Sequence, residues 1–166
     1  MVVSACGGED TPAPQVSENS VQSSHLTDTS SGTATPSNDA ETVEVSASEA
    51  FAALPEPYKS TDYNRGRRTF KLCQSCHTLQ EGGQNLVGPN LYGMFGRQIG
   101  AVEGYSYSRA VQDSEIIWTP ELLAEWLESP RNFLPGNRMS FAGVRRPDDR
   151  TAVIAYIMSE TGYSSE

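Results

Sequence analysis

The chain has 166 residues and a formal net charge of −9, and its length fits one domain of ordinary size. The charge is uneven, because residues 1–54 contain eight acidic residues and no Lys or Arg, whereas all 12 basic residues lie in 55–166. The sequence therefore excludes a strongly basic footprint of the kind that binds nucleic acid. It also contains no apolar run long enough to cross a bilayer as a helix.

The N-terminal third differs in composition from the rest of the chain. Residues 7–56 are rich in Ser, Thr, Pro and acidic residues, and their apolar residues follow neither a helical nor a strand period. Such a segment cannot bury enough apolar area to offset the entropy lost on ordering. We expect a disordered acidic linker over 7–56, with at most weak helical character near 49–54, and a globular domain over 57–166.

The first predicted elements of the globular domain are a helix and a long loop. Thr61 or Asp62 is suited to cap a helix that runs to about Leu72. Residues 78–105 are rich in Gly, Asn and Pro, which predicts an ordered loop. A short helix over 105–112 is expected to follow that loop.

Two further helices have clear start signals. Thr119 followed by Pro120 provides an N-cap hydroxyl and a proline at the first helical position, and Pro130 is expected to end that helix. Pro147 opens a last helix by the same logic, with Gly162 as its C-cap. No strand pattern competes, so the predicted fold class is all-α. It has about four to five helices and long loops, which need a large apolar object to fold around.

The most informative motif is Cys73-Gln74-Ser75-Cys76-His77. Two thiols three positions apart, followed at once by an imidazole, form the attachment pattern of a c-type haem. The thiols add to the two vinyl groups of the porphyrin, and His77 then lies under the iron as an axial ligand. The sequence therefore predicts one haem c, covalently bound through Cys73 and Cys76.

Cys-x-x-Cys pairs also occur in structural zinc sites and in thioredoxin-like redox sites. A zinc site needs two further ligands, and the remaining candidates are His25 and Cys6, both in the tail. A thioredoxin-like site needs a βαβ setting, which the pattern of elements does not provide. Haem attachment is the interpretation that these residues favour over zinc or dithiol chemistry.

A haem iron with one histidine ligand still needs a sixth ligand. Met94, Met139 and Met158 compete for this role, although a lone methionine is usually a core residue. Met158 falls on the last predicted helix, and Met94 follows His77 closely in a Gly-rich loop. Met139 comes after a Pro-Gly turn that can aim its side chain inward, so His77 and Met139 are the predicted metal ligands.

Together with these motifs, further residues form a pattern that covers most of the globular domain. The residues of the pattern fall into seven short stretches. They occur at 66–70 (GRRTF), 73–77, 88–93 (GPNLYG), 95–97 (FGR), 104–107 (GYSY), 118 (W) and 135–141 (PGNRMSF). In this order they make the sequence resemble a class I cytochrome c of the mitochondrial type, shared with small bacterial cytochromes, over roughly Thr61 to Gly162. The resemblance implies that the first and last helices cross, here at Gly66, Phe70 and Tyr156.

The resemblance also implies roles around the haem. Pro89 would accept a hydrogen bond from the outer ring nitrogen of His77, and Phe141 would cover the haem edge. An isolated buried carboxylate is costly, so the haem propionates need buried donors. The residues implied for that role are Arg97, Tyr107 and Trp118.

This sequence departs from the family pattern at three positions near the haem. Trp126 stands where the family commonly has a tyrosine that hydrogen-bonds the methionine sulfur, so its indole either replaces that bond or fills space. Asn137 replaces a threonine near the ligand, and Val111 replaces an asparagine that is a polar partner for buried water. We expect these changes to affect the reduction potential rather than the ligands themselves.

The resemblance implies a one-electron carrier and not an enzyme, because a six-coordinate iron leaves no open site for substrate. Its partners would be redox proteins such as a cytochrome bc1-type complex and a terminal oxidase, and it would act as a monomer. A haem enzyme or a gas sensor is the alternative, but either needs an open iron position, and the only histidine in 57–166 is His77. Partner docking would use the residues that align with the family's basic ring: Arg68, Arg131, Arg138, Arg145 and Arg146.

The N-terminus carries one further motif. Val3-Ser4-Ala5-Cys6-Gly7 resembles the end of a bacterial lipoprotein signal, in which a cysteine after small residues receives lipid. We expect residues 1–6 to be a remnant of such a signal and the protein to be exported to a bacterial periplasm, anchored to the membrane through Cys6. Residues 7–56 would then tether the carrier as it moves between membrane complexes.

Overall fold

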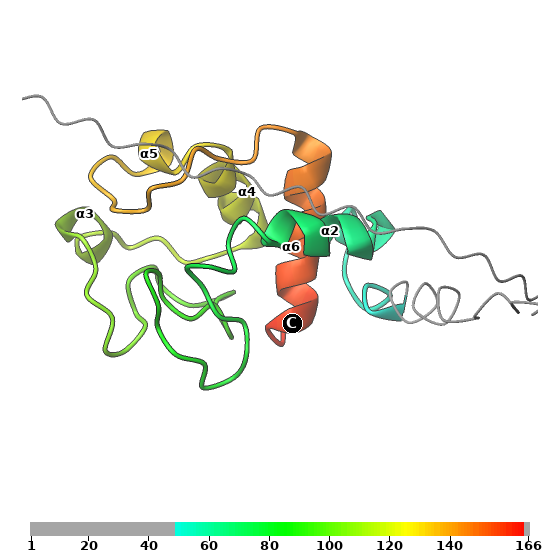
Figure 1. Cartoon of the computed structure of the whole chain (residues 1–166), viewed down its shortest axis with the longest axis horizontal. Helices are drawn as coiled ribbons and strands as arrows, with labels where there is room; N and C mark the ends of the chain where they lie inside the picture. Colours follow the sequence, from blue (N-terminus) through cyan, green and yellow to red (C-terminus); the bar gives the residue numbers. More distant parts are fainter. Residues whose placement is uncertain (1–48, 165–166) are drawn as a thin grey trace, which may run out of the picture. The chain divides into compact units, whose positions relative to one another are not determined.

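The computed structural model describes residues 49–164, so the predicted lipoprotein motif with Cys6, His25 and most of the predicted linker lie outside it. The helices in this part of the chain (Figure 1) are η1 (Tyr58–Ser60), α2 (Tyr63–Phe70), α3 (Arg109–Gln112), α4 (Pro120–Glu128), α5 (Pro130–Phe133) and α6 (Pro147–Glu160). Residues 49–164 form no strand, only an isolated bridge between Gln98 and Ile117. The all-α prediction is therefore confirmed. Of the helices described, none is both long and apolar enough for a membrane span.

The two helices with predicted caps begin as expected. The Asp62 carboxylate accepts a hydrogen bond from the Arg65 backbone N–H at the start of α2. The Thr119 hydroxyl accepts one from the Leu122 backbone N–H at 3.2 Å, and Pro120 occupies the first position of α4. Each cap satisfies an N–H that has no partner inside its helix, which fixes where the helix starts.

Two helix boundaries differ from the predicted ones. α3 begins only at Arg109, because the Ser108 side chain caps it by accepting from the Val111 backbone N–H. α4 ends at Glu128, but Pro130 also begins α5, a four-residue helix that was not predicted. A proline lacks the N–H that a first helical residue leaves unpaired anyway, so it can end one helix and begin the next.

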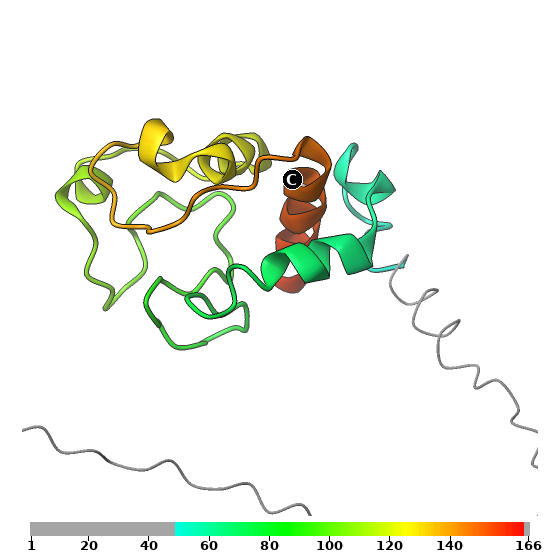
Figure 2. The ribbon, with the colours of Figure 1, turned by 45° about the horizontal axis from the view of Figure 1, so that its top comes forward.

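The crossing of α2 and α6 organises the fold, and the two helices lie across one another in both views (Figures 1 and 2). Gly66 lies at the contact: a Cβ there would sit 2.8 Å from the Tyr156 Cβ and would also overlap the Ala152 carbonyl. The rings of Phe70 and Tyr156 pack 5.5 Å apart. The predicted crossing is therefore confirmed, and it anchors α2, whose C-terminal end leads directly into Cys73.

α6 supplies a large share of the core. Its buried residues are Ala152, Val153, Ile154, Ala155, Ile157 and Met158. Met158 is 1% exposed, so its side chain is a core residue, as its place on the last helix predicts.

The folded part begins earlier than the predicted boundary at residue 57. Phe51 is 1% exposed and Leu54 is 7% exposed, and the Phe51 ring packs 5.3 Å from that of Tyr63 on α2. Tyr63 in turn packs 5.4 Å from Tyr156 on α6. The predicted end of the linker at residue 56 is therefore corrected. Two apolar side chains in a polar stretch have no period that a sequence pattern could reveal, yet both are buried, Phe51 against the ring of Tyr63.

We predict that Phe51→Ala lowers the free energy of unfolding by about 3–5 kcal/mol, because truncating a buried Phe removes apolar contacts and leaves a cavity. Chemical denaturation followed by far-UV circular dichroism measures the change. Ala53→Ser, at an exposed neighbouring position, is the control and should stay within about 0.5 kcal/mol of the native value. Equal stabilities of Phe51→Ala and the native protein would contradict the burial of this segment.

Candidate functional site

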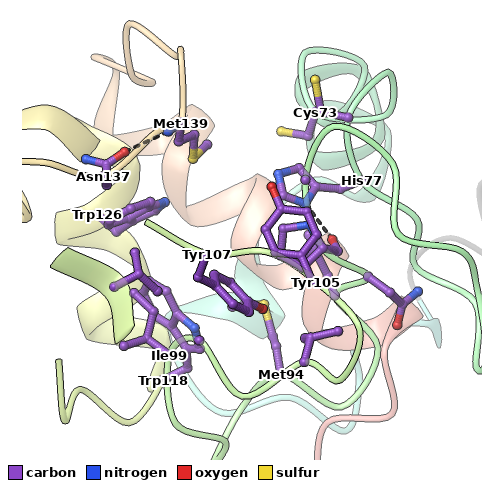
Figure 3. A pocket seen from close by; sticks show the side chains of 18 of the residues that line it. Cys73, His77, Met94, Ile99, Tyr105, Tyr107, Trp118, Trp126, Asn137 and Met139 are labelled. Atoms are coloured by element: carbon purple, nitrogen blue, oxygen red, sulfur yellow. Dashed lines mark hydrogen bonds between the residues drawn. The ribbon is translucent and has the colours of Figure 1, made fainter. Parts of the chain in front are cut away.

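A pocket of about 260 Å³ is lined by the motif after α2, the loop that follows it, α4 and the segment between α5 and α6. Most of the lining side chains are apolar or aromatic. Figure 3 shows His77 and Met139 on opposite sides of this pocket, with Trp126 on the Met139 side. All ten residues predicted to surround a cofactor line it: Cys73, Cys76, His77, Pro89, Arg97, Tyr107, Trp118, Trp126, Met139 and Phe141.

The two thiols lie on a helical turn that continues α2. The Cys73 backbone N–H donates to the Phe70 carbonyl at 2.8 Å, and the N–H groups of Cys76 and His77 donate to the Cys73 carbonyl at 2.9 and 3.0 Å. This turn brings both sulfurs and the imidazole to one pocket. Burial, with a smaller effect from Cys76, raises the pKa of the Cys73 thiol to about 11. Both cysteines are free of disulfides, so both sulfurs are available for attachment.

The His77 imidazole is held in one orientation. Its Nδ1–H donates to the Pro89 carbonyl at 2.7 Å, which leaves the Nε2 lone pair free for a metal ion. Burial lowers the pKa of His77 and outweighs the opposite effect of this hydrogen bond, so the ring is neutral at physiological pH. Gly88 packs against the ring, since a Cβ there would come within 2.7 Å of Nδ1. A neutral, oriented imidazole is the form that ligates a metal.

A side chain with no predicted role holds the loop after the motif. The Asn90 amide donates to the Thr78 hydroxyl at 2.7 Å and to the Gln80 carbonyl at 3.0 Å, and its oxygen accepts from the Tyr92 N–H at 3.0 Å. These bonds fix the loop that carries Pro89 to the imidazole. A single Asn in a Gly-rich loop gives only a weak sequence signal, because most of its partners are backbone groups that any sequence provides.

Aromatic rings line the Met139 side of the pocket. Trp126 packs edge-to-face against Trp118 at 5.6 Å and against Phe133 at 5.8 Å. These contacts fix the indole, and Figure 3 shows its nitrogen at the pocket end of the ring. The two predicted alternatives, a donor to the methionine sulfur and a space filler, are both compatible with this position.

Two arginines, Arg97 and Arg138, are the charged residues that line the pocket, and no carboxylate of residues 49–164 lines it. The Arg97 guanidinium donates to the Tyr92 carbonyl at 3.0 Å, and that of Arg138 donates to the Ser106 carbonyl. Each guanidinium has five N–H donors, so both retain donors beyond these bonds. An apolar pocket with two cations and no lining acid favours a ligand that carries anionic groups.

Tyr107 and Trp118, which were predicted to act with Arg97, also lie at this pocket. Burial raises the pKa of Tyr107, so its phenol stays protonated and can donate a hydrogen bond. The Trp118 backbone N–H donates to the Arg97 carbonyl at 3.0 Å. This bond joins the segment before α4 to the arginine and keeps both side chains at the same part of the pocket.

The lining fits a haem better than a bare metal ion. Two thiols and an oriented imidazole lie on one side, a thioether on the other, with apolar walls between them and cationic groups at the edge. Within residues 49–164, no three His, Cys, Asp or Glu side chains come together as a metal-binding group. The zinc alternative therefore lacks ligands in the part of the chain that the structure describes.

Residues 63–161 match the family model described as Cytochrome c. The chain belongs to the cytochrome c family. The cytochrome c of Kluyveromyces lactis is 38% identical over 106 residues, which cover 63% of this chain and 96% of that protein. The cytochrome c of Trypanosoma brucei brucei is 54% identical over 77 residues, 46% of this chain and 83% of that protein. That of Stellaria longipes is 42% identical over 105 residues, 63% of this chain and 97% of that protein.

Membership of the family establishes the cofactor and the general function of this cytochrome. It is a class I c-type cytochrome with a covalently attached haem c, for which Cys73 and Cys76 provide the thioether bonds. It is a haem-based electron carrier and not an enzyme. The family match begins at residue 63, so the N-terminal motif around Cys6 lies outside it.

The five arginines predicted for partner docking are all exposed, but their neighbours differ. Two of them lie near acidic side chains: Arg68 at 3.9 Å from Asp62 and Arg146 at 3.5 Å from Asp149. Arg138 lines the pocket. Arg131 and Arg145 form no ion pair with another residue of 49–164, which leaves their charges available to a partner.

Proposed function

We propose that His77 and Met139 are the axial ligands of the iron in this cytochrome. The observation that carries this proposal is the placement of the two side chains on opposite sides of one apolar pocket (Figure 3). The hydrogen bond to Pro89 occupies the Nδ1 proton of His77 and leaves Nε2 for the iron. The haem would supply a metal centre that accepts and releases one electron.

The side chains of the pocket would favour the reduced state. The Met139 thioether is a soft ligand that prefers ferrous iron, and the apolar walls disfavour the additional positive charge of ferric iron. Pro89 makes the His77 ring more basic through its hydrogen bond, which acts in the opposite direction. We expect the first two effects to prevail and the reduction potential to be clearly positive, which suits a respiratory chain.

We predict that Met139→Leu abolishes the far-red charge-transfer band that a methionine sulfur gives on ferric iron. The same variant should bind carbon monoxide in the ferrous state, because leucine leaves the sixth position open. Absorption spectra of the two redox states measure both effects. Met94→Leu is the matched control, since Met94 also lines the pocket and is 3% exposed. Loss of the band in Met94→Leu with an intact band in Met139→Leu would contradict the proposed ligand pair.

We further propose that the protein carries electrons from a quinol–cytochrome c reductase to a terminal oxidase. Leu72 and Val87, which are 60% and 78% exposed, also line the pocket. The pocket therefore has an accessible apolar edge at which a partner could approach the haem. Arg131 and Arg145 are exposed and form no ion pair with another residue of 49–164. Their free positive charges favour a transient partner with acidic groups and an association that weakens with salt.

We predict that Arg145→Glu slows oxidation by the terminal oxidase by roughly threefold at low ionic strength, because it removes an attractive charge and adds a repulsive one. High salt should diminish the difference, since screening weakens interactions between exposed charges. Stopped-flow oxidation measures the rate. Arg109→Glu makes the same charge change on α3, at a side chain that is 89% exposed and outside the pocket. Equal slowing by the two variants would contradict a docking role for Arg145.

We also propose a periplasmic location with a lipid anchor on Cys6. The support comes from the residues alone: the small side chains of Ser4 and Ala5 precede Cys6, and Gly7 follows it. A random coil with the length of the predicted linker would have a root-mean-square span of ~35–40 Å. Such a tether would keep the carrier close to membrane complexes while allowing it to move between them.

We predict that the native protein partitions into the detergent phase in a Triton X-114 extraction and that Cys6→Ser partitions into the aqueous phase. The reason is that only the cysteine thiol can receive the lipid. Ser23→Ala, also in the tail, should partition like the native protein. Aqueous partitioning of the native protein together with a free thiol at Cys6 would contradict the anchor.

A further inference from the structure

A tight turn presents Met139 to the pocket. The Asn137 backbone N–H donates to the Leu134 carbonyl at 3.2 Å across Pro135 and Gly136, and Gly136 has a φ of +88°. Proline at the second position and glycine with positive φ at the third position form the pattern of a type II turn. The chain is therefore reversed immediately after α5, two residues before Met139.

The Asn137 side chain ties this turn to its surroundings with three hydrogen bonds. Its amide Nδ2 donates to the Pro130 and Leu134 carbonyls, both at 2.8 Å. Its Oδ1 accepts from the Met139 backbone N–H at 2.9 Å, the dashed bond beside Met139 in Figure 3. One side chain thus connects both ends of α5 to the backbone of Met139.

These three bonds require an amide. A hydroxyl of Ser or Thr offers one donor, and an ionised Asp offers none, whereas Asn provides two donors and an acceptor on one planar group. α5 has four residues, too few for a helix to be stable by its own hydrogen bonds. The position of the turn therefore depends on the packing of α5 against α4 and on the Asn137 amide.

We propose that Asn137 is a positioning residue for Met139: it holds the Met139 backbone so that the thioether stays on the iron and resists displacement by external ligands. This role rests on the proposed ligation by His77 and Met139. The asparagine is one of the positions at which the sequence departs from the family pattern. In this chain, the segment before Met139 is held by the three hydrogen bonds of the Asn137 amide.

The rate of cyanide binding to the ferric holoprotein tests this role, because cyanide needs the position that the methionine vacates. Asn137→Asp has nearly the same shape but loses both donors and places an oxygen against two carbonyls. We expect it to raise the rate by about tenfold, in line with the loss of two hydrogen bonds. Asn137→Ala should raise the rate of cyanide binding by a similar factor. If circular dichroism shows that Asn137→Asp is unfolded, Asn137→Ala serves as the test in its place.

Two matched variants separate positioning from a change in charge or in overall stability. Asn132→Asp makes the same substitution at an exposed position of α5, and we expect its rate to stay within about twofold of the native rate. Phe51→Ala lowers stability from a position outside the pocket, and it should also leave the rate unchanged. The proposed role would be overturned if both Asn137 variants bound cyanide at the rate of the native protein. It would also be overturned if Phe51→Ala raised the cyanide-binding rate as much as the Asn137 variants do.

The native spectrum distinguishes this failure from a failure of the ligation. A far-red band in the native protein together with unchanged cyanide rates in the Asn137 variants would overturn the role of Asn137 alone. Absence of the band in the native protein would overturn the ligation by Met139, and the positioning role with it.

Discussion

The hydrogen bond from the His77 imidazole to the Pro89 carbonyl, 2.7 Å long, is the constraint on which the site depends. It selects the tautomer, fixes the ring and leaves Nε2 free for the proposed bond to the iron. The bond forms only if the loop after the motif returns to the imidazole. That return is secured by the Asn90 amide, which holds the loop, and by Gly88, where any side chain would overlap the ring.

The two sides of the pocket are held by different parts of the fold. The thiols and the imidazole continue α2, which is locked against α6 at a glycine that admits no Cβ. Met139 lies on a segment without regular structure, next to the short helix α5. Its position therefore depends on particular side chains, the Asn137 amide and the rings around Trp126. We therefore expect the histidine side to be the more rigid of the two and ligand exchange to occur on the methionine side.

Features with a local sequence signal could be predicted from the residues themselves, whereas distant contacts such as the crossing of α2 and α6 could be predicted only through the family resemblance. The cap at Thr119 and the attachment motif at Cys73–His77 each involve residues within a few positions of one another, so their patterns can be read from the chain alone. The burial of Phe51 depends instead on rings of α2 and α6. The bonds of Asn137 involve α5, a helix whose four residues have no period to detect.

The central claim is that one haem, covalently bound through Cys73 and Cys76, is ligated by His77 and Met139. The most direct measurement is the absorption spectrum of the native protein in both oxidation states, after extraction of any free haem with a denaturing solvent. We predict a retained c-type haem with the far-red band of a methionine sulfur on ferric iron. A retained haem without that band, in a protein that binds carbon monoxide readily, would contradict the claim.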